Sequence, residues 1–382
     1  MRTGTVQLGQ ICEFVYGESL KEEKRRPGKI PVYGSNGVVG WHEHAITSGP
    51  TIVIGRKGSI GEVNWSNGPC FPIDTTYYVE RTKKPCDLRW LFFILQKLDL
   101  PRLNKSAAVP GLNRDDAYEQ LIPFPDLYEQ QRISAQLDQT DRLRRMRRYA
   151  RELSDTLLPS IFLELFGDPR TNPNGYPVHE LGEYILFLTS GSRGWAQHYS
   201  QKGARFIRSL DVQMNEISNT GAVYVIPPAN AEARRTQVQT GDVLLTITGS
   251  RIGRVAPVMP YIGEAYVSQH VAIIRINNEL LPEYLSMFLS HELGGQLQIA
   301  KVQYGQTKPG LNLDQIREFK APIPILSDQL RFRRILHKYE QLKLLHLEAQ
   351  RQAEQLFQTL LHQSFTGELT PESQPLRATI LA

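Results

Sequence analysis

Hydrophobic and polar residues follow two different patterns along the chain, and the change between them marks out its parts. In the first pattern, short runs rich in β-branched and apolar residues lie between clusters of glycine, asparagine, serine and proline, which predicts strands joined by tight turns. These runs are residues 51–54, 76–79, 243–248 and 271–276. Residues 88–98 and 282–289 have apolar positions at helical spacing, so they are predicted as short helices on those sheets. Each region is therefore predicted to be a compact α/β module.

The second pattern occupies two long stretches without glycine. A Pro-x-Pro sequence precedes each stretch, and no glycine occurs between Tyr128 and Gly167 or between Ser327 and Gly367. Each stretch is predicted to be one long helix, broken at most near Pro159. About 38 residues with a rise of about 1.5 Å each would give a rod of roughly 57 Å.

Apolar residues in both long stretches recur every three or four positions, which predicts a coiled-coil seam. The predicted seam is Leu143, Met146, Ala150, Leu153 and Leu157 in the first stretch and Leu342, Leu345, Ala349 and Leu356 in the second. A rod with one apolar stripe needs a partner helix, and the nearest candidate is the other stretch. The alternative is that the two helices only complete two adjacent globular cores.

The second half of the chain repeats the first. The sequence Pro-Gly-Leu-Asn at residues 110–113 recurs at residues 309–312, and this offset of 199 continues to Phe166 and Phe365 with 16 identities in 57 pairs. Upstream, Leu8-Gly9 and Leu181-Gly182 correspond more loosely. A repeat of nearly two hundred residues is too long for a solenoid unit, so it indicates two whole domains in tandem.

These patterns predict an α+β fold with two duplicated α/β modules separated by two long helices. The predicted boundaries are residues 1–125 for the first module, 126–168 for the first helix, 169–325 for the second module, 326–369 for the second helix and 370–382 for a C-terminal tail.

Composition narrows the class of protein. The chain has 382 residues, 41% of them hydrophobic and 22% charged, which is typical of a folded protein with sizeable cores. Lys and Arg (44) exceed Asp and Glu (39) by five, which permits a polyanionic partner without requiring one. Three cysteines without zinc or disulfide spacing, and no apolar run long enough for a membrane, predict a protein of the reducing cytoplasm.

Motifs for catalysis are missing from the sequence. The glycine-rich strings at residues 34–40 and 55–61 do not have dinucleotide-binding spacing, and no phosphate-loop string is present. Asp74, Glu80 and Lys83 resemble a nuclease set, but the last spacing is one residue too long. An Asp/Asn-Pro-Pro-Tyr string, typical of adenine methylation, is also missing. We therefore expect no catalytic residue, no metal site and no cofactor in this chain, which leaves recognition.

Candidate DNA-binding residues lie in the turns of the two modules, where Arg, Lys, Asn and Ser stand beside glycine. Glycine lets the backbone approach a surface closely, and Arg and Asn can read guanine and adenine edges. The candidates are Ser35, Asn36, Arg56, Lys57, Ser59, Arg193, Arg208, Ser250 and Arg251. Ordinary solvated loops are the alternative for each residue alone. Similar placement of the strings at residues 56–61 and 250–253 in the two halves favours recognition.

The first long helix also carries a dense run of arginines: Arg142, Arg144, Arg145, Arg147, Arg148 and Arg151. Repulsion within such a run disfavours leaving it unpaired, so we expect it to contact phosphates or acidic side chains of another subunit. A solvated helix face is the alternative. All six arginines are expected to lie outside the apolar seam.

Taken in order, several motifs resemble the specificity (S) subunit of type I restriction-modification systems. They are Ile-Pro-Val-Tyr-Gly-Ser-Asn-Gly at residues 30–37, Gly-Arg-Lys-Gly-Ser-Ile-Gly at 55–61, the repeated Pro-Gly-Leu-Asn, Ile-Pro-Phe-Pro at 122–125 followed by Glu-Gln-Gln-Arg at 129–132, Phe-Gly-Asp-Pro at 166–169 and Phe-Thr-Gly-Glu-Leu at 365–369. The second module departs from the pattern, with Phe-Ile-Arg-Ser-Leu at 206–210, and the second helix lacks the arginine run.

This resemblance implies that each module is a target-recognition domain for one half of a bipartite DNA sequence, and that the two helices pair antiparallel as a spacer. It also implies two methyltransferase subunits and motor-endonuclease subunits as partners, with S-adenosylmethionine, ATP and magnesium bound by those partners. The methyltransferase would flip an adenine out of the duplex and methylate N6. Two rival functions remain at this point: a self-contained nuclease using Asp74, Glu80 and Lys83, or a coiled-coil scaffold that binds only protein.

Overall fold

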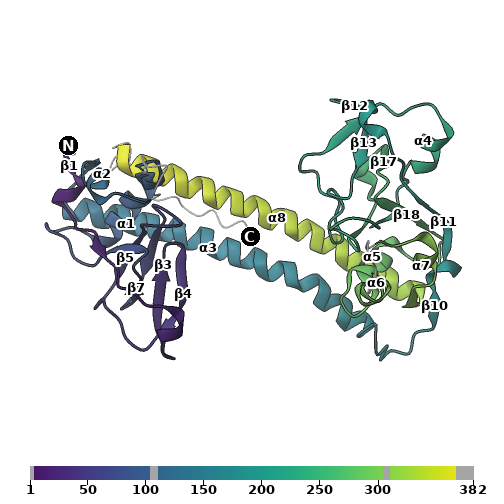
Figure 1. Cartoon of the computed structure of the whole chain (residues 1–382), viewed down its shortest axis with the longest axis horizontal. Helices are drawn as coiled ribbons and strands as arrows, with labels where there is room; N and C mark the ends of the chain where they lie inside the picture. The colour runs from purple at the N-terminus through teal and green to yellow at the C-terminus, as the bar shows by residue number, and fades with distance from the viewer. Residues whose placement is uncertain (1–3, 104–110, 304–309, 367–382) are drawn as a thin grey trace, which may run out of the picture. The chain divides into compact units, whose positions relative to one another are not determined.

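The computed structural model describes residues 4–103, 111–303 and 310–366, which form two compact units (Figure 1). Unit 1 takes residues up to Tyr149 together with those from Leu347 onward, and unit 2 is Ala150–His346. The division runs through both long helices, so the module and helix boundaries predicted from the sequence stay a prediction. Parts of the sequence predictions lie outside the described residues: the expected tail at residues 370–382, residues 367–369, Pro110 and Pro309.

Unit 1 contains the first module, built on short strands and helices. Its elements are β1 (Thr5–Gln7), β2 (Val15–Tyr16), β3 (Ile30–Gly34), β4 (Gly37–His42), β5 (Thr51–Gly55), β6 (Val63–Ser66), β7 (Phe71–Pro72), β8 (Thr76–Val79), α1 (Leu88–Lys97), α2 (Arg114–Tyr118) and β9 (Leu121–Pro123). One sheet has the order β2-β8-β5-β6 with antiparallel neighbours. A second sheet, β4-β3-β7, contains one parallel pair, β3 with β7. Strands β1 and β9 pair separately.

Unit 2 contains the second module. Its elements are β10 (Val178–Glu180), β11 (Ile185–Ser190), β12 (Tyr199–Ser200), β13 (Ala204–Ile207), β14 (Val223–Val225), α4 (Ala231–Thr236), β15 (Val243–Thr246), β16 (Val255–Pro257), β17 (Ala265–Val267), β18 (Val271–Ile276), α5 (Pro282–Ser290), α6 (Gly295–Gln303), α7 (Leu313–Arg317) and β19 (Lys320–Pro322). The sheets have the orders β11-β18-β15-β16 and β12-β14-β13-β17, and β10 pairs with β19.

The two modules share one topology, except that the second sheet has three strands in the first module and four in the second, and this likeness confirms the duplication. Each has an antiparallel four-stranded sheet, a second sheet with one parallel pair, and a two-stranded pair that joins the first strand of the module to its last. All four strands predicted from the sequence are present as β5, β8, β15 and β18, and both predicted short helices are present as α1 and α5.

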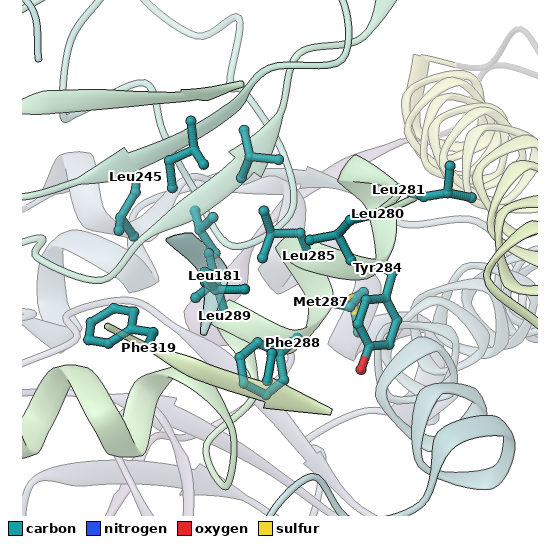
Figure 2. Packing of buried hydrophobic residues seen from close by; sticks show 14 of the residues in the cluster. Leu181, Leu245, Leu280, Leu281, Tyr284, Leu285, Met287, Phe288, Leu289 and Phe319 are labelled. Carbon is teal, nitrogen blue, oxygen red and sulfur yellow. The ribbon is translucent and has the colours of Figure 1, made fainter. Parts of the chain in front are cut away.

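The core of the second module forms between its strands and α5 (Figure 2). Leu285, Phe288 and Leu289 of α5 are at most 1% exposed, and Leu181 and Leu245 are fully buried in the same cluster. Burying each such side chain contributes about 1.5–3 kcal/mol. Because α5 is apolar around most of its circumference, it is held between the sheet and the long helices.

The two long helices are α3 (Leu127–Phe166) and α8 (Leu326–Thr366), as predicted, and α3 continues through Pro159. They pair antiparallel. In unit 1, Ile133 of α3 shares a core with Phe357 and Leu361 of α8. In unit 2, the ring of Phe332 of α8 lies 5.8 Å from the ring of Phe162 of α3.

The residues that make this pairing are not the predicted seam, and that part of the prediction is wrong. Met146, Leu153 and Leu345 are 59%, 53% and 65% exposed. The other predicted seam positions are exposed or half-buried as well: Leu143, Ala150, Leu157, Leu342, Ala349 and Leu356. Large aromatic residues near the helix ends pack instead, because they bury more area against the modules than leucines in the middle of the helices do. The buried parts of the helices also belong to the cores of the two units.

A buried glutamine attaches each module to its long helix. The Gln130 side chain accepts a hydrogen bond from the Asp87 backbone N–H (2.9 Å) and donates one to the Pro125 carbonyl (2.8 Å). Gln329 accepts from the backbone N–H of Leu281 (2.8 Å) and donates to the Pro324 carbonyl (2.7 Å). Both side chains are at most 1% exposed, so losing either would leave buried polar groups unpaired. We call these two arrangements the glutamine joints.

Candidate nucleic-acid interface

In the first module, two turns that the sequence analysis selected pack against each other. Ser35 and Asn36 form the turn between β3 and β4, where Gly34 pairs with Gly37. A side chain at Gly55 would place its Cβ 2.9 Å from the Ser35 carbonyl, so only glycine permits this close approach. The structure therefore brings Ser35 and Asn36 to the hairpin loop between β5 and β6, which carries the other candidates of this module: Arg56, Lys57 and Ser59.

Three of these side chains, Asn36, Lys57 and Ser59, are exposed. Arg56 is partly buried, and one of its Nη atoms donates a hydrogen bond to the Asp74 carbonyl at 2.6 Å. Its guanidinium lies 5.2 Å from the ring centroid of Tyr16, a residue that the sequence analysis did not select. This end of the module thus presents exposed hydrogen-bonding groups beside a guanidinium held on an aromatic ring.

The Tyr77 ring packs against the Tyr16 ring, and the Tyr77 hydroxyl stays uncharged. Its ring centroid lies 5.0 Å from that of Tyr16 in an edge-to-face arrangement, and its hydroxyl donates to the Leu112 carbonyl at 3.1 Å. Burial, followed by the hydrogen bond with Tyr16, raises the pKa of Tyr77 to about 12. The Tyr77 hydroxyl therefore contributes no negative charge at neutral pH.

In the second module, the equivalent hairpin loop connects β15 to β16 and contains the candidates Ser250 and Arg251. Ser250 is exposed, and the Arg251 guanidinium reaches the Leu210 carbonyl at 3.5 Å. The loop closes as in the first module, because the Gly253 N–H donates to the Thr246 carbonyl at 3.0 Å. Gly253 has a φ of 88°, which favours glycine. The similar placement of the two candidate strings is therefore confirmed as two equivalent hairpin loops.

The other two candidates of the second module have different surroundings. Arg193 is exposed next to the buried Trp195. Arg208 makes two hydrogen bonds from its guanidinium to Asp211, at 3.0 and 2.9 Å, and Asp211 is 1% exposed. A third bond runs to the Gly221 carbonyl at 2.9 Å. Arg208 thus stabilises its own loop, and whether it also contacts DNA stays a prediction.

The three residues of the nuclease rival lie at separate places in the first module. Glu80 accepts hydrogen bonds from Ser48, and although burial opposes it, these bonds lower the pKa of Glu80. Lys83 donates to the Gly9 carbonyl at 2.9 Å, and Asp74 lies in the turn beside Arg56. Among the described residues, no group of three or more His, Cys, Asp or Glu side chains is arranged to hold a metal ion.

Within the arginine run, two members pair inside the protein. Arg144 is bound to Asp141 (2.7 Å) and Glu354 (3.2 Å), and Arg145 is bound to Asp141 (2.9 Å). The Arg144 guanidinium also lies 3.8 Å from the ring centroid of Phe357, so this arginine takes part in the contact between the two helices. Arg142, Arg147 and Arg148 are exposed, and Arg151 is half-buried. Their contact with phosphates or another subunit stays a prediction.

A family model, described as the type I restriction modification DNA specificity domain, matches residues 3–150 and 213–355. The chain belongs to this specificity family. It is a DNA specificity subunit, and none of the comparisons favours a nuclease or a protein-binding scaffold. No curated protein sequence matches the chain. In the described part of the chain, no helix is long and apolar enough to span a bilayer.

Solved structures of low sequence identity share the fold of this specificity subunit. The crystal structure of the S subunit of a type I restriction-modification system from M. genitalium matches with a TM-score of 0.65 and 18% identity, over 95% of this chain and 96% of that one. A chain from a structure on complex assembly and conformational transition of the type I R-M system matches with a TM-score of 0.58 and 17% identity, over 96% and 98%.

Sequence reasoning missed two residues at the candidate interface of this specificity subunit. Tyr16 is 49% exposed, and Arg114, the first residue of α2, has its guanidinium 5.3 Å from the Tyr16 ring. One signal was available for Arg114, since it directly follows the repeated Pro-Gly-Leu-Asn. Nothing near Tyr16 in the sequence indicates its partners, which are 40 and 98 residues further along.

Proposed function

We propose that this chain is the non-catalytic DNA-reading subunit of a type I restriction-modification complex, in which each module reads one half of a bipartite DNA target. The observation that carries this proposal is that one topology, with a single extra strand in the second module, occurs twice, while the exposed residues at the equivalent hairpin loops differ. Two readers of one design with different surfaces suit a target whose halves have different sequences.

The two long helices suit a spacer between the half-sites. A helix of 40 residues extends about 60 Å, and it transmits a fixed geometry that a flexible linker does not. The antiparallel pairing of α3 with α8 near both helix ends adds stiffness. We therefore propose that the helices determine how many unread base pairs separate the two half-sites.

Catalysis belongs, in this proposal, to partner subunits in the cytoplasm. Two methyltransferase subunits would transfer a methyl group from S-adenosylmethionine to adenine N6, and motor-endonuclease subunits would use ATP and magnesium for cleavage. The scattered positions of Asp74, Glu80 and Lys83 support a chain without its own nuclease chemistry. Assays of the purified chain with DNA, S-adenosylmethionine, magnesium and ATP should show neither methylation nor cleavage, and turnover there would overturn this part.

A module exchange tests the reading of separate half-sites. Residues 1–125 are replaced by the first module of another member of the specificity family, with Gln130 and both long helices retained. Methylated motifs are then mapped across the genome in cells that contain the methyltransferase partner. Only one half of the motif should change, because the second module and its mounting are unchanged.

The matched control exchanges the second module in the same way and should change only the other half. A variant in which both halves of the motif change would contradict the proposal, since the modules would then not read independently. Cells that lack the chain should lose the methylated motif altogether.

A further inference from the structure

The duplicated backbone allows a position-by-position comparison of the two candidate interfaces. In the first module, the Gly17 N–H donates to the Thr76 carbonyl at 3.1 Å, and in the second, the Gly191 N–H donates to the Val271 carbonyl at 3.1 Å. A side chain on either glycine would collide with the backbone that follows β7 or β17, at 2.2 Å in both cases. These bonds align Tyr16 with Ser190 and Tyr77 with Ala272.

A second pair of backbone bonds aligns the rest of the interface. The Leu112 N–H donates to the Arg56 carbonyl at 2.9 Å, and the Leu311 N–H donates to the Ile247 carbonyl at 2.9 Å. Leu112 and Leu311 are also partners in the sequence repeat with its offset of 199. The alignment therefore places Arg56 opposite Ile247 and Arg114 opposite Leu313.

Four side chains of the first module thus have no counterpart of their type in the second, and we call them the Tyr16 cluster: Tyr16, Arg56, Tyr77 and Arg114. The two guanidiniums lie 5.2 and 5.3 Å from the Tyr16 ring centroid, and the Tyr77 ring lies 5.0 Å from it. The second module has Ser, Ile, Ala and Leu at these positions on the same backbone. The module fold therefore does not need the cluster.

The charge of the cluster points to a ligand. Two guanidiniums on one ring repel each other, and that cost is unnecessary for folding. In the part of the chain that the structure describes, no hydrogen bond or ion pair involves the Arg114 guanidinium. Stacking on an aromatic ring fixes the plane of a guanidinium, so less freedom is lost when it binds a planar pair of acceptors. Arg114 is thus held ready for an acceptor outside the chain.

We propose that the Tyr16 cluster is the principal DNA contact of the first module, with Arg114 donating hydrogen bonds to DNA acceptors while Tyr16 and Tyr77 hold it in place. This rests on the proposed function, in which the first module reads DNA. The acceptor is either a guanine edge or a phosphate oxygen, which share the paired geometry that a guanidinium matches. The second module, without the cluster, contacts its half-site through other side chains.

The test uses the full chain together with its methyltransferase partner. Arg114→Gln removes the charge, Arg114→Lys keeps the charge but loses the planar pair of donors, and Tyr16→Ser introduces the residue of the second module. Arg81→Gln is the matched control, because Arg81 is exposed on the same module beyond the opposite end of β8. Affinity for a duplex carrying the wild-type motif is measured between about 50 and 200 mM salt, and methylated motifs are mapped in cells.

Arg114→Gln should weaken binding about tenfold or more, while Arg81→Gln should stay within about twofold. Tyr16→Ser should weaken binding by a smaller factor, since Arg114 remains but is no longer held. If the acceptor is guanine, Arg114→Lys should also lose affinity, and the motif should relax at one position of one half-site. If the acceptor is phosphate, Arg114→Lys should bind nearly normally, and Arg114→Gln should reduce the salt slope by about 0.9 for every sequence.

The proposal is overturned if Arg114→Gln binds and methylates like Arg81→Gln in a complex of normal composition. A wild-type complex that shows no sequence-specific methylation would instead refute the proposed function. Co-purification with the methyltransferase and the far-UV circular dichroism of each variant identify one that fails to fold, and in that case Arg114→Lys supplies the comparison.

Discussion

Replacing Arg144 by Gln should destabilise the contact between the two long helices in unit 1. The Arg144 guanidinium lies 3.8 Å above the buried Phe357 ring and is bound to Asp141 at 2.7 Å and Glu354 at 3.2 Å. The Arg144 and Asp141 side chains are only 18% and 7% exposed. Arg144 therefore connects α3 to α8 through contacts that are partly shielded from solvent. From the sequence alone it looks like one more arginine of a solvent-exposed run.

The size of the effect follows from these contacts. A hydrogen bond between charged groups contributes about 1.5–3 kcal/mol, and a partly buried cation–π contact contributes about 1 kcal/mol. The Glu354 side chain is 43% exposed, so that ion pair adds less than about 1 kcal/mol. Asp141 keeps Arg145 at 2.9 Å, which offsets part of the loss. We expect the free energy of unfolding of this region to fall by about 2 kcal/mol.

Hydrogen–deuterium exchange of the full chain, read by mass spectrometry over residues 133–145 and 353–361, measures this loss locally. Arg147→Gln is the matched control, because Arg147 is exposed three residues further along the same helix, and its effect should stay below about 0.5 kcal/mol. Equal protection in the two variants would refute the bridging role of Arg144. A loss spread evenly over both units would refute its assignment to unit 1.

Three further predictions concern the helices and unit 2. Inserting seven residues into the middle of both long helices should lengthen the unread spacer by about three base pairs, since about 10 Å of helix corresponds to about three base-pair steps of 3.4 Å. If mapping of the methylated motif shows an unchanged spacer, the helices do not set the distance between the half-sites. Replacing the exposed Arg142, Arg147 and Arg148 by Gln should leave the fold intact but weaken the complex. Failure to co-purify with the methyltransferase before DNA is added would indicate a protein partner, and a flatter salt dependence of binding for every DNA sequence would indicate phosphates. Normal assembly with normal DNA binding would contradict both. Burial lowers the pKa of His291 below its ordinary 6.5, so the unfolded chain binds the proton more readily than the folded chain. The contribution of His291 to the stability of unit 2 should therefore be fully present above pH 6.5 and fall as the pH drops below it. Urea unfolding at several pH values measures this loss, and His291→Gln should remove it.

The elements predicted from sequence were those with strong local signals. The glycine-free stretches after the two Pro-x-Pro sequences became α3 and α8, because nothing in them interrupts the backbone hydrogen bonds of a helix except Pro159. The choice of seam failed for a different reason. Spacing by three and four shows which residues share a face of a helix, but the face that is buried depends on where the module packs, and this is a long-range property.

The candidate interface divides in the same way. Arg56, Lys57 and Ser59 were recognisable because one loop presents them together with glycine. Tyr16 and Arg114 are nearly one hundred residues apart and meet only through the pairing of β2 with β8 and the contact of Leu112 with Arg56. Spacing alone does not reveal such a meeting.

The glutamine joints bear on how genes of this kind can change. Each joint is made by a glutamine at the start of a long helix, the backbone carbonyl of a proline five residues before it and a backbone N–H just before α1 or α5. Apart from the glutamine, only backbone groups take part, so the joint makes few demands on the side chains of the module. A recombination event that brings in a different module ahead of the glutamine would therefore leave its mounting intact. Such exchange could produce a new target in a single genetic step.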